Sequence, residues 1–349
     1  MLSELSVIEG EYLRDILDQP RALGNTLAGL EESKKLKDLA ARLRQGKFRT
    51  VVLTGMGSSF HALHPLDLKL IDEGLAAIMV ETSELVHYKS RLFDPRTLIV
   101  AVSQSGQSAE VVRLLEINGG KAAIIAITNT PGSPLDTEAD ATILTQAGKE
   151  FSVSCKTYVT ALMALKWLED VICERDLGRT RKELKEAAPA VESYLVDWKD
   201  HVQSLAVRLE GIRHLFLVGR GSSLAAVGTG ALIVKESDHF PAEGMSSAAF
   251  RHGPFEMLGE ETLVLVFSGD SQTGDLNRRL LEDIREQQGR AELVSETSEF
   301  AACALGRAPR CLQSILEILP VQMITLALAA QAGREAGRFE LAAKVTTTE

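Results

Sequence analysis

Residues 53–59, LTGMGSS, decide the fold, because the chain repeats them in recognisable form as residues 217–223, LVGRGSS. A second pair of segments matches at nearly the same offset: LIVAVSQSG at residues 98–106 corresponds to LVLVFSGDS at residues 263–271. Each segment is an apolar run that ends in Gly and Ser, which is typical of a buried strand followed by a tight turn. Matching segments about 165 residues apart indicate two copies of one domain.

Further short apolar runs surround the first copy of this pattern. Helix-like stretches separate these runs, which cover residues 51–53, 77–80, 98–102, 123–127 and 141–144. Such alternation predicts a parallel sheet that is covered by helices on both faces. The predicted fold class is therefore α/β, with two tandem doubly wound, mostly parallel sheets of the flavodoxin-like or Rossmann-like kind.

The domain boundaries follow from the same patterns. A chain of 349 residues has enough material for two cores of ordinary size. We expect a helical arm over residues 1–33, a first domain over 34–195, a second domain over 196–335, and a tail over 336–349.

Composition argues against several classes of partner. The net charge is −10, and no cluster of Lys and Arg is present to meet a nucleic-acid backbone. The N-terminus lacks the basic and apolar regions of a secretory signal. The apolar run at 318–332 is interrupted by Pro320 and is too short to span a bilayer, so it predicts a buried helix. We expect a cytoplasmic protein with no nucleic-acid or membrane partner.

The cysteines argue against a metal site, and the glycine loops argue against a nucleotide cofactor. The four cysteines are scattered without metal-ligand spacing, which favours a reducing compartment and no metal site. Phe60 stands where a dinucleotide-binding loop has its third glycine, and no GxxxxGK[ST] motif occurs. We therefore expect no cofactor.

Polar loops after the predicted strands are suited to an anion. Glycine turns at the start of a helix expose backbone amides and Ser hydroxyls that can donate hydrogen bonds without a formal charge. The loop at 103–108, SQSGQS, crowds hydroxyl and amide side chains into six residues. The alternative interpretation is a polar turn with a helix cap. Because open α/β sheets bind ligands at the carboxyl ends of their strands, the position favours a phosphate-binding loop.

These loops, together with TNTPGSPL at 128–135 and RHGP at 251–254, resemble the sugar isomerase (SIS) family. The closest resemblance is to the isomerase half of glucosamine-6-phosphate synthase and to related amino sugar phosphate deaminases, isomerases and deglycases. It extends from about residue 12 to the end of the chain. The resemblance implies two tandem SIS domains, with the phosphosugar bound by the first and the C-terminal tail contributing to the active site.

The resemblance also implies site residues. The family's phosphate-binding positions fall on Ser59, Ser103, Gln104, Ser105 and Ser108. Further contacts to the substrate fall on Gly57, Ser58 and Val153, the last through its backbone.

The implied catalytic residues are Glu236, His252 and Lys344. A desolvated carboxylate can remove a proton next to a carbonyl, which suits Glu236 as the base. The imidazole of His252 suits ring opening near neutral pH, and the amine of Lys344 can form a Schiff base with the open-chain sugar. The resemblance further implies a homodimer in which His252 completes the partner's site.

Departures from the synthase pattern leave several functions open. Thr229 and Ile233 replace a glutamate and a lysine of that pattern, and we expect no glutamine-hydrolysing domain before Met1. The leading interpretation is an isomerase or deaminase of the glucosamine-6-phosphate/fructose-6-phosphate type. The alternatives are a fructosamine-6-phosphate deglycase, which would not require Lys344, and a non-catalytic phosphosugar sensor.

Overall fold

The computed structural model describes residues 5–341 and 343–346. Its internal contacts divide the chain into two units. The N-repeat unit comprises Arg21–Lys149, Lys156–Lys185 and Ala342–Glu349. The C-repeat unit comprises Met1–Pro20, Glu150–Cys155 and Glu186–Leu341. Each unit therefore contains one copy of the repeated sequence together with short segments from other parts of the chain.

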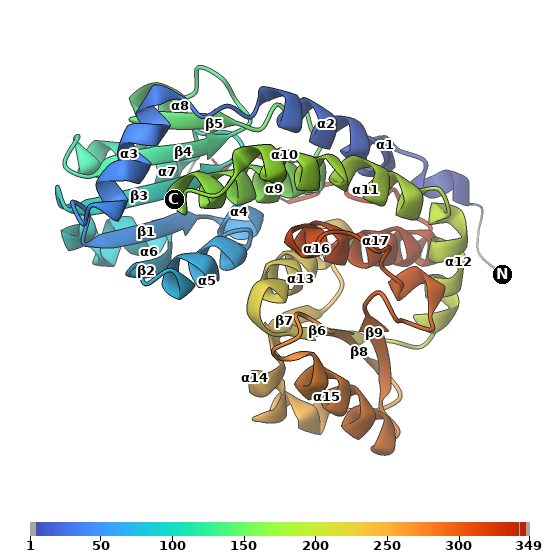
Figure 1. Cartoon of the computed structure of the whole chain (residues 1–349). Coiled ribbons are helices and arrows are strands. Elements are labelled where there is room, and N and C mark those ends of the chain that lie inside the picture. Colours follow the sequence, from blue (N-terminus) through green and yellow to red (C-terminus); the bar gives the residue numbers. More distant parts are fainter. Residues whose placement is uncertain (1–4, 342, 347–349) are drawn as a thin grey trace. The chain divides into compact units, whose positions relative to one another are not determined.

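The N-repeat unit is built on a five-stranded parallel sheet in the order β2-β1-β3-β4-β5 (Figure 1). Its strands are β1 (Thr50–Gly55), β2 (Ala77–Glu81), β3 (Thr97–Ser103), β4 (Ala123–Thr128) and β5 (Ala141–Leu144). All seven residues of β3 are buried, as expected for a central strand with helices on both faces. This strand order is that of a doubly wound flavodoxin-like sheet, so the predicted fold class is confirmed.

Two helical layers cover this sheet. One apolar core lies under α6 (Thr82–Tyr88), α7 (Ala109–Asn118) and α8 (Pro134–Glu138). The other layer contains α3 (Lys34–Arg44), α5 (His64–Asp72) and α9 (Lys156–Ile172). The short helix α4 (Gly57–His61) follows β1 directly, and α10 (Leu177–Lys185) packs on α9.

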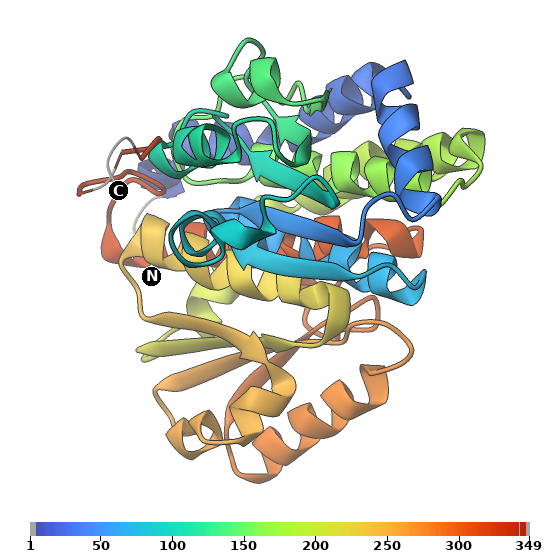
Figure 2. The same cartoon turned by 90° about the vertical axis from the view of Figure 1, so that its left-hand side faces the viewer.

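The C-repeat unit has a four-stranded parallel sheet in the order β7-β6-β8-β9. Its strands are β6 (His214–Gly219), β7 (Ala242–Ser246), β8 (Thr262–Phe267) and β9 (Arg290–Val294). In Figure 2, α13 (Leu224–Asp238, yellow) and α15 (Gly274–Glu286, orange) lie on opposite sides of this sheet. The four strands match β1 to β4 in order and direction, which confirms the predicted repeat. Among the described residues no strand equivalent to β5 pairs with β9, and this edge carries an isolated parallel bridge between Ser295, just after β9, and Ala304, so β9 is an edge strand.

The remaining helices belong to the ends of the chain and to the connection between the repeats, except α14, which follows β7 inside the second repeat. They are α1 (Glu11–Leu17), α2 (Gln19–Gly29), α11 (Ala187–Leu195), α12 (Trp198–Arg208), α14 (Ser247–Arg251), α16 (Gln313–Glu317) and α17 (Leu319–Ala332). The run Arg310–Ala332 is long and apolar enough to cross a membrane by composition alone, but 89% of its apolar 18-residue stretch is buried inside the structure. It has the burial of a core segment, in agreement with the buried helix predicted over residues 318–332.

Candidate functional site

The loop that follows β3 forms a tight cradle in the N-repeat unit. The hydroxyl of Ser103 accepts a 3.0 Å hydrogen bond from the amide of Gly106, and the hydroxyl of Ser105 accepts one of 3.3 Å from Gln107. Gly106 has φ +63°, and a β carbon there would collide with Ser133. Glycine is therefore required for the loop to close this tightly.

The loop after β4 is tied to this cradle. The carbonyl oxygen of Gln104 accepts hydrogen bonds from the amide of Asn129 at 3.2 Å and from the hydroxyl of Thr130 at 3.1 Å. Ser103 pairs in register with Thr128 in the parallel sheet, which brings the two loops to the same edge. The structure thus joins two motifs that lie 25 residues apart in the sequence.

Ser108 and Ser59 complete the set of predicted phosphate contacts. Ser108 precedes the first residue of α7 and is half-buried, and its side chain makes no capping hydrogen bond to that helix in the described structure. Its hydroxyl is therefore available to a ligand at the positive end of the helix dipole. Ser59, with Gly57 and Ser58, lies in α4, directly after the strand that neighbours β3. All the predicted phosphate-binding residues thus follow the carboxyl ends of two adjacent strands.

The C-terminal tail contacts the same helix terminus. The carbonyl oxygen of Thr346 accepts a 3.1 Å hydrogen bond from the amide of Ala109, the first residue of α7. Lys344 lies two residues earlier and is half-buried. The structure therefore brings the segment that carries Lys344 to the helix that begins at the cradle.

Glu236 lies in the last turn of α13 in the C-repeat unit and is half-buried. The amide of Gly337 donates a 3.0 Å hydrogen bond to the hydroxyl of Ser237, and the carbonyl oxygen of Gly337 accepts one from Ser152. Ser152 precedes Val153, which is fully buried. Gly337 thereby links the immediate neighbours of two predicted site residues, Glu236 and Val153.

Acidic groups gather near Glu236 around a buried tyrosine. Tyr12 has its pKa raised well above the ordinary value, first by burial and then by the charges of Cys155, Asp238 and Glu236. Burial also raises the pKa of Asp238 well above its ordinary value. Sequence reasoning missed Tyr12 and Asp238, because an aromatic residue at helical spacing is read as core and a single acid at a helix end as solvated.

A buried lysine was missed as well. Lys156, the first residue of α9 in the N-repeat unit, is only 4% exposed, although lysine side chains are rarely buried unless paired. The sequence stretch around it offers no signal for this burial.

His252 stands apart from the other predicted residues. It caps the C-terminal end of α14 and is exposed, and no hydrogen bond joins it to another predicted site residue in the described part of the chain. Its catalytic role stays a prediction.

The two departures from the synthase pattern lie in the core of the C-repeat unit. Thr229 and Ile233 are both fully buried on α13. The hydroxyl of Thr229 has no hydrogen-bond partner among the described residues. These positions therefore contribute packing and carry no charge.

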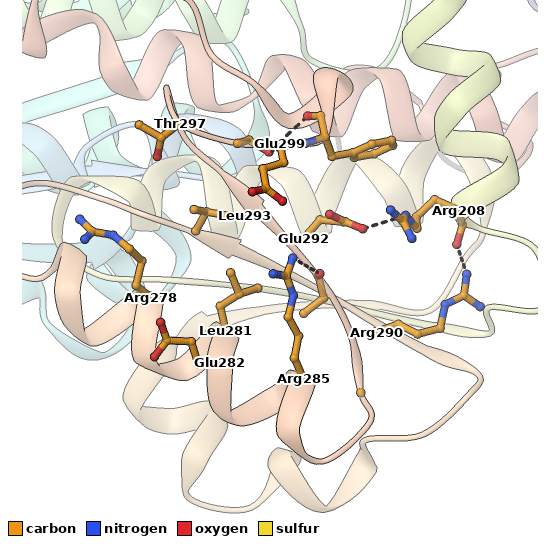
Figure 3. Close-up of a pocket in the computed structure, with 14 residues that line it drawn as sticks. Arg208, Arg278, Leu281, Glu282, Arg285, Arg290, Glu292, Leu293, Thr297 and Glu299 are labelled. Carbon is orange, nitrogen blue, oxygen red and sulfur yellow. Dashed lines mark hydrogen bonds and ion pairs between the residues drawn. The ribbon is translucent and has the colours of Figure 1, made fainter.

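A pocket of about 640 Å³ lies beside the edge strand β9 (Figure 3). Several arginines line it, but partners within the unit engage their guanidinium groups. Arg208 pairs with Glu292 at 2.7 Å, and Arg285 donates to the carbonyl oxygen of Ala291 at 3.3 Å. Arg290 binds the carbonyl oxygen of Glu210 at 2.9 Å. The pocket is therefore a weaker anion site than its composition suggests.

Comparisons with known proteins agree with the repeat. A sequence model of the SIS domain matches residues 42–168 and 208–298. The glutamine–fructose-6-phosphate aminotransferase (isomerizing) of Pyrococcus horikoshii is 28% identical over the whole of this chain, which spans 59% of that relative's length.

Two solved structures extend the comparison. A Silicibacter pomeroyi protein, provisionally described as a phosphosugar isomerase, is 27% identical with a TM-score of 0.79 over 93% of this chain and 99% of its own. Glucosamine-6-phosphate deaminase of Thermotoga maritima has the same fold, with a TM-score of 0.78 at 19% identity over 97% of this chain and 100% of its own.

Proposed function

The chain belongs to the SIS domain family, and from that premise we propose that it is a phosphosugar enzyme acting on an amino sugar phosphate. The proposed reaction is an aldose–ketose isomerisation or a deamination of the glucosamine-6-phosphate/fructose-6-phosphate type. The observation that carries the proposal is the cradle, a tight loop that carries Ser103 and Ser105 and ends with Ser108 at the start of α7. Hydroxyls and amides at a helix N-terminus are suited to a phosphate dianion.

The residue roles follow from their chemistry. Ser59, Ser103, Gln104, Ser105 and Ser108 bind the phosphate, and Gly57, Ser58 and Val153 contact the rest of the sugar. Glu236 removes a proton from the carbon next to the carbonyl group, so that the carbonyl can move between C1 and C2. His252 assists ring opening and Lys344 forms a Schiff base with the open-chain sugar. We further propose a cytoplasmic homodimer in which His252 serves the partner's site, with no cofactor.

The relatives support this proposal without fixing the reaction. The name of the Pyrococcus relative describes an isomerising aminotransferase, but this chain spans only part of that protein. The Thermotoga deaminase shows that the fold accommodates removal of an amino group from a hexosamine phosphate. An isomerase or deaminase needs the same base and the same phosphate contacts, so both reactions remain within the proposal.

The decisive experiment incubates the purified protein with a panel of hexosamine 6-phosphates and fructosamine 6-phosphates. Ammonia, free amino acid and ketose phosphate are followed together. Ammonia release identifies a deaminase, interconversion without ammonia an isomerase, and amino acid release a deglycase. Binding of the panel without turnover would replace the proposal with a sensor function.

Glu236→Gln tests the assigned base. We expect turnover to fall by at least about 100-fold, because general base catalysis typically contributes a factor of this order or more. Binding of the sugar phosphate should change little. The control is Lys235→Gln, an exposed neighbour on α13. Full turnover in Glu236→Gln would remove this residue from the mechanism.

A further inference from the structure

The two repeats can be compared loop by loop, because their helices begin at equivalent positions. α7 begins at Ala109 and α15 at Gly274, each directly after the loop that follows an equivalent strand. This offset of 165 residues aligns Ser105 with Asp270 and Ser108 with Thr273. The second repeat therefore carries a carboxylate where the cradle has a hydroxyl.

Asp270 holds the amides of its own loop. Its Oδ1 accepts hydrogen bonds from the amide of Gln272 at 2.9 Å and from the amide of Thr273 at 3.2 Å. It also accepts one from the hydroxyl of Thr273 at 3.4 Å. In the cradle, Gln107 is the equivalent of Gln272, and its amide donates a hydrogen bond to the hydroxyl of Ser105. A carboxylate thus occupies donors of the kind that a bound anion requires.

A second carboxyl group binds the hydroxyl that is equivalent to that of Ser59. Ser223 aligns with Ser59 in the repeated glycine loops, and its hydroxyl donates a 2.7 Å hydrogen bond to Oε1 of Glu317. Glu317 is fully buried, and the same oxygen accepts a 2.9 Å hydrogen bond from Gln313. Gln313 also donates to the carbonyl oxygen of Gly269 at 3.0 Å, which ties this cluster to the Asp270 loop.

Space for a small ligand remains beside these groups. A pocket of about 250 Å³ is lined by Ser268, Asp270, Gln313 and two arginines, Arg278 and Arg310. It lies after the carboxyl ends of β8 and β9, the position at which open α/β sheets bind ligands. The second repeat therefore keeps a pocket at the location of a binding site, while hydrogen-bond donors of its loops are directed to internal carboxyl groups.

We propose that the C-repeat unit contains a latent phosphate-monoester site that its own carboxyl groups, Asp270 and Glu317, keep closed. The inference rests on the proposed phosphate-binding role of the cradle. The two carboxyl groups occupy donors that a bound anion would use, and the carboxylate of Asp270, which lines the pocket, repels a second dianion. They thereby restrict phosphosugar binding to one domain of the repeat.

The test exchanges the equivalent residues between the repeats. Asp270→Ser combined with Glu317→Gln removes both carboxyl groups from the C-repeat unit, and Ser105→Asp introduces a carboxylate into the cradle. Binding of fructose 6-phosphate is measured by titration calorimetry, and circular dichroism verifies that each variant is folded. The matched control is Glu282→Ser, which removes an exposed carboxylate of α15 that does not line this pocket.

We expect one bound fructose 6-phosphate per wild-type chain and two per chain in the double variant. With Ser105→Asp added, only the new site should bind, and Glu282→Ser should match the wild type within about twofold. A folded double variant with at least tenfold weaker binding at a second site than at the cradle would overturn the inference. If the double variant does not fold, Asp270→Ser alone must show the gain. Unchanged binding in Ser105→Asp would instead refute the proposed role of the cradle.

Discussion

Gly337 lies directly against the ring of Tyr12: a β carbon at residue 337 would come within 2.5 Å of Tyr12 Cγ. The ring cannot move aside easily, because Tyr12 is only 1% exposed. Gly337 also has φ +72° and hydrogen bonds to Ser152 and Ser237. Helix α1, the loop at 150–155 and the end of α13 are therefore joined at one glycine.

Replacing Gly337 should destabilise the C-repeat unit strongly. We expect Gly337→Ala to lower the free energy of unfolding by about 2 to 4 kcal/mol, from backbone strain at positive φ and from the clash with Tyr12. The control is Gly333→Ala, where φ is +65° and a β carbon would meet no atom within 4 Å. That variant should lose only about 1 kcal/mol. Urea denaturation of both variants measures the difference, and equal losses would show that the contact with Tyr12 is unimportant.

Glu317 should make the stability fall as the pH rises. Burial raises its pKa from the ordinary 4.5 to about 7. The folded state therefore keeps a proton that the unfolded state releases between about pH 4.5 and 7. Across that window the free energy of unfolding should decrease by up to about 3 kcal/mol.

The pH dependence can be assigned with one substitution. Glu317→Gln should flatten the curve of urea midpoint against pH between 5 and 8 and should be more stable than the wild type at pH 8. Glu282→Gln, an exposed carboxylate on α15, should leave the curve unchanged. An identical slope in Glu317→Gln and the wild type would assign the effect to another group.

Ser108→Ala should weaken substrate binding without loss of stability. The hydroxyl does not cap α7, so its removal costs the helix little, while a bound phosphate loses one charge-assisted hydrogen bond. We expect the Kd for fructose 6-phosphate to rise by about tenfold, which corresponds to about 1.4 kcal/mol. Gln107→Ala, exposed on the same loop, serves as the control for calorimetry. Equal binding by both variants would place the phosphate elsewhere.

Thr229→Val should be neutral or stabilising. The buried hydroxyl of Thr229 has no partner among the described residues, and valine fills nearly the same volume without the polar atom. We expect a gain of up to about 1 kcal/mol in the free energy of unfolding, measured by urea denaturation. A clear loss of stability would indicate that the hydroxyl is hydrogen-bonded in solution.

The parts of the fold that depend on local pattern were predictable from the sequence. An apolar run that ends in Gly and Ser specifies a strand and its turn, so the repeat at 53–59 and 217–223 predicted both parallel sheets. The cradle followed from the same reasoning, because adjacent parallel strands end at one edge.

The parts that depend on distant segments were not predictable. Tyr12, Cys155 and Asp238 meet only because the ends of the chain and one loop fold onto the second repeat. Similarly, Glu317 precedes an apolar helix, and nothing in its neighbours shows that its carboxyl group binds Ser223, 94 residues away. Single-sequence patterns carry no information about such partners.

The edge strand β9 has a consequence for how the molecule behaves at high concentration. The outer side of an edge strand presents backbone groups that can pair with another chain, which leads to fibrous aggregates. The guanidinium group of Arg285 covers the carbonyl oxygen of Ala291 on this strand, and Arg208 and Glu292 place a charged pair beside it. Arg285 therefore hinders the pairing of β9 with another chain. We expect that replacing Arg285 with a neutral residue promotes polymerisation.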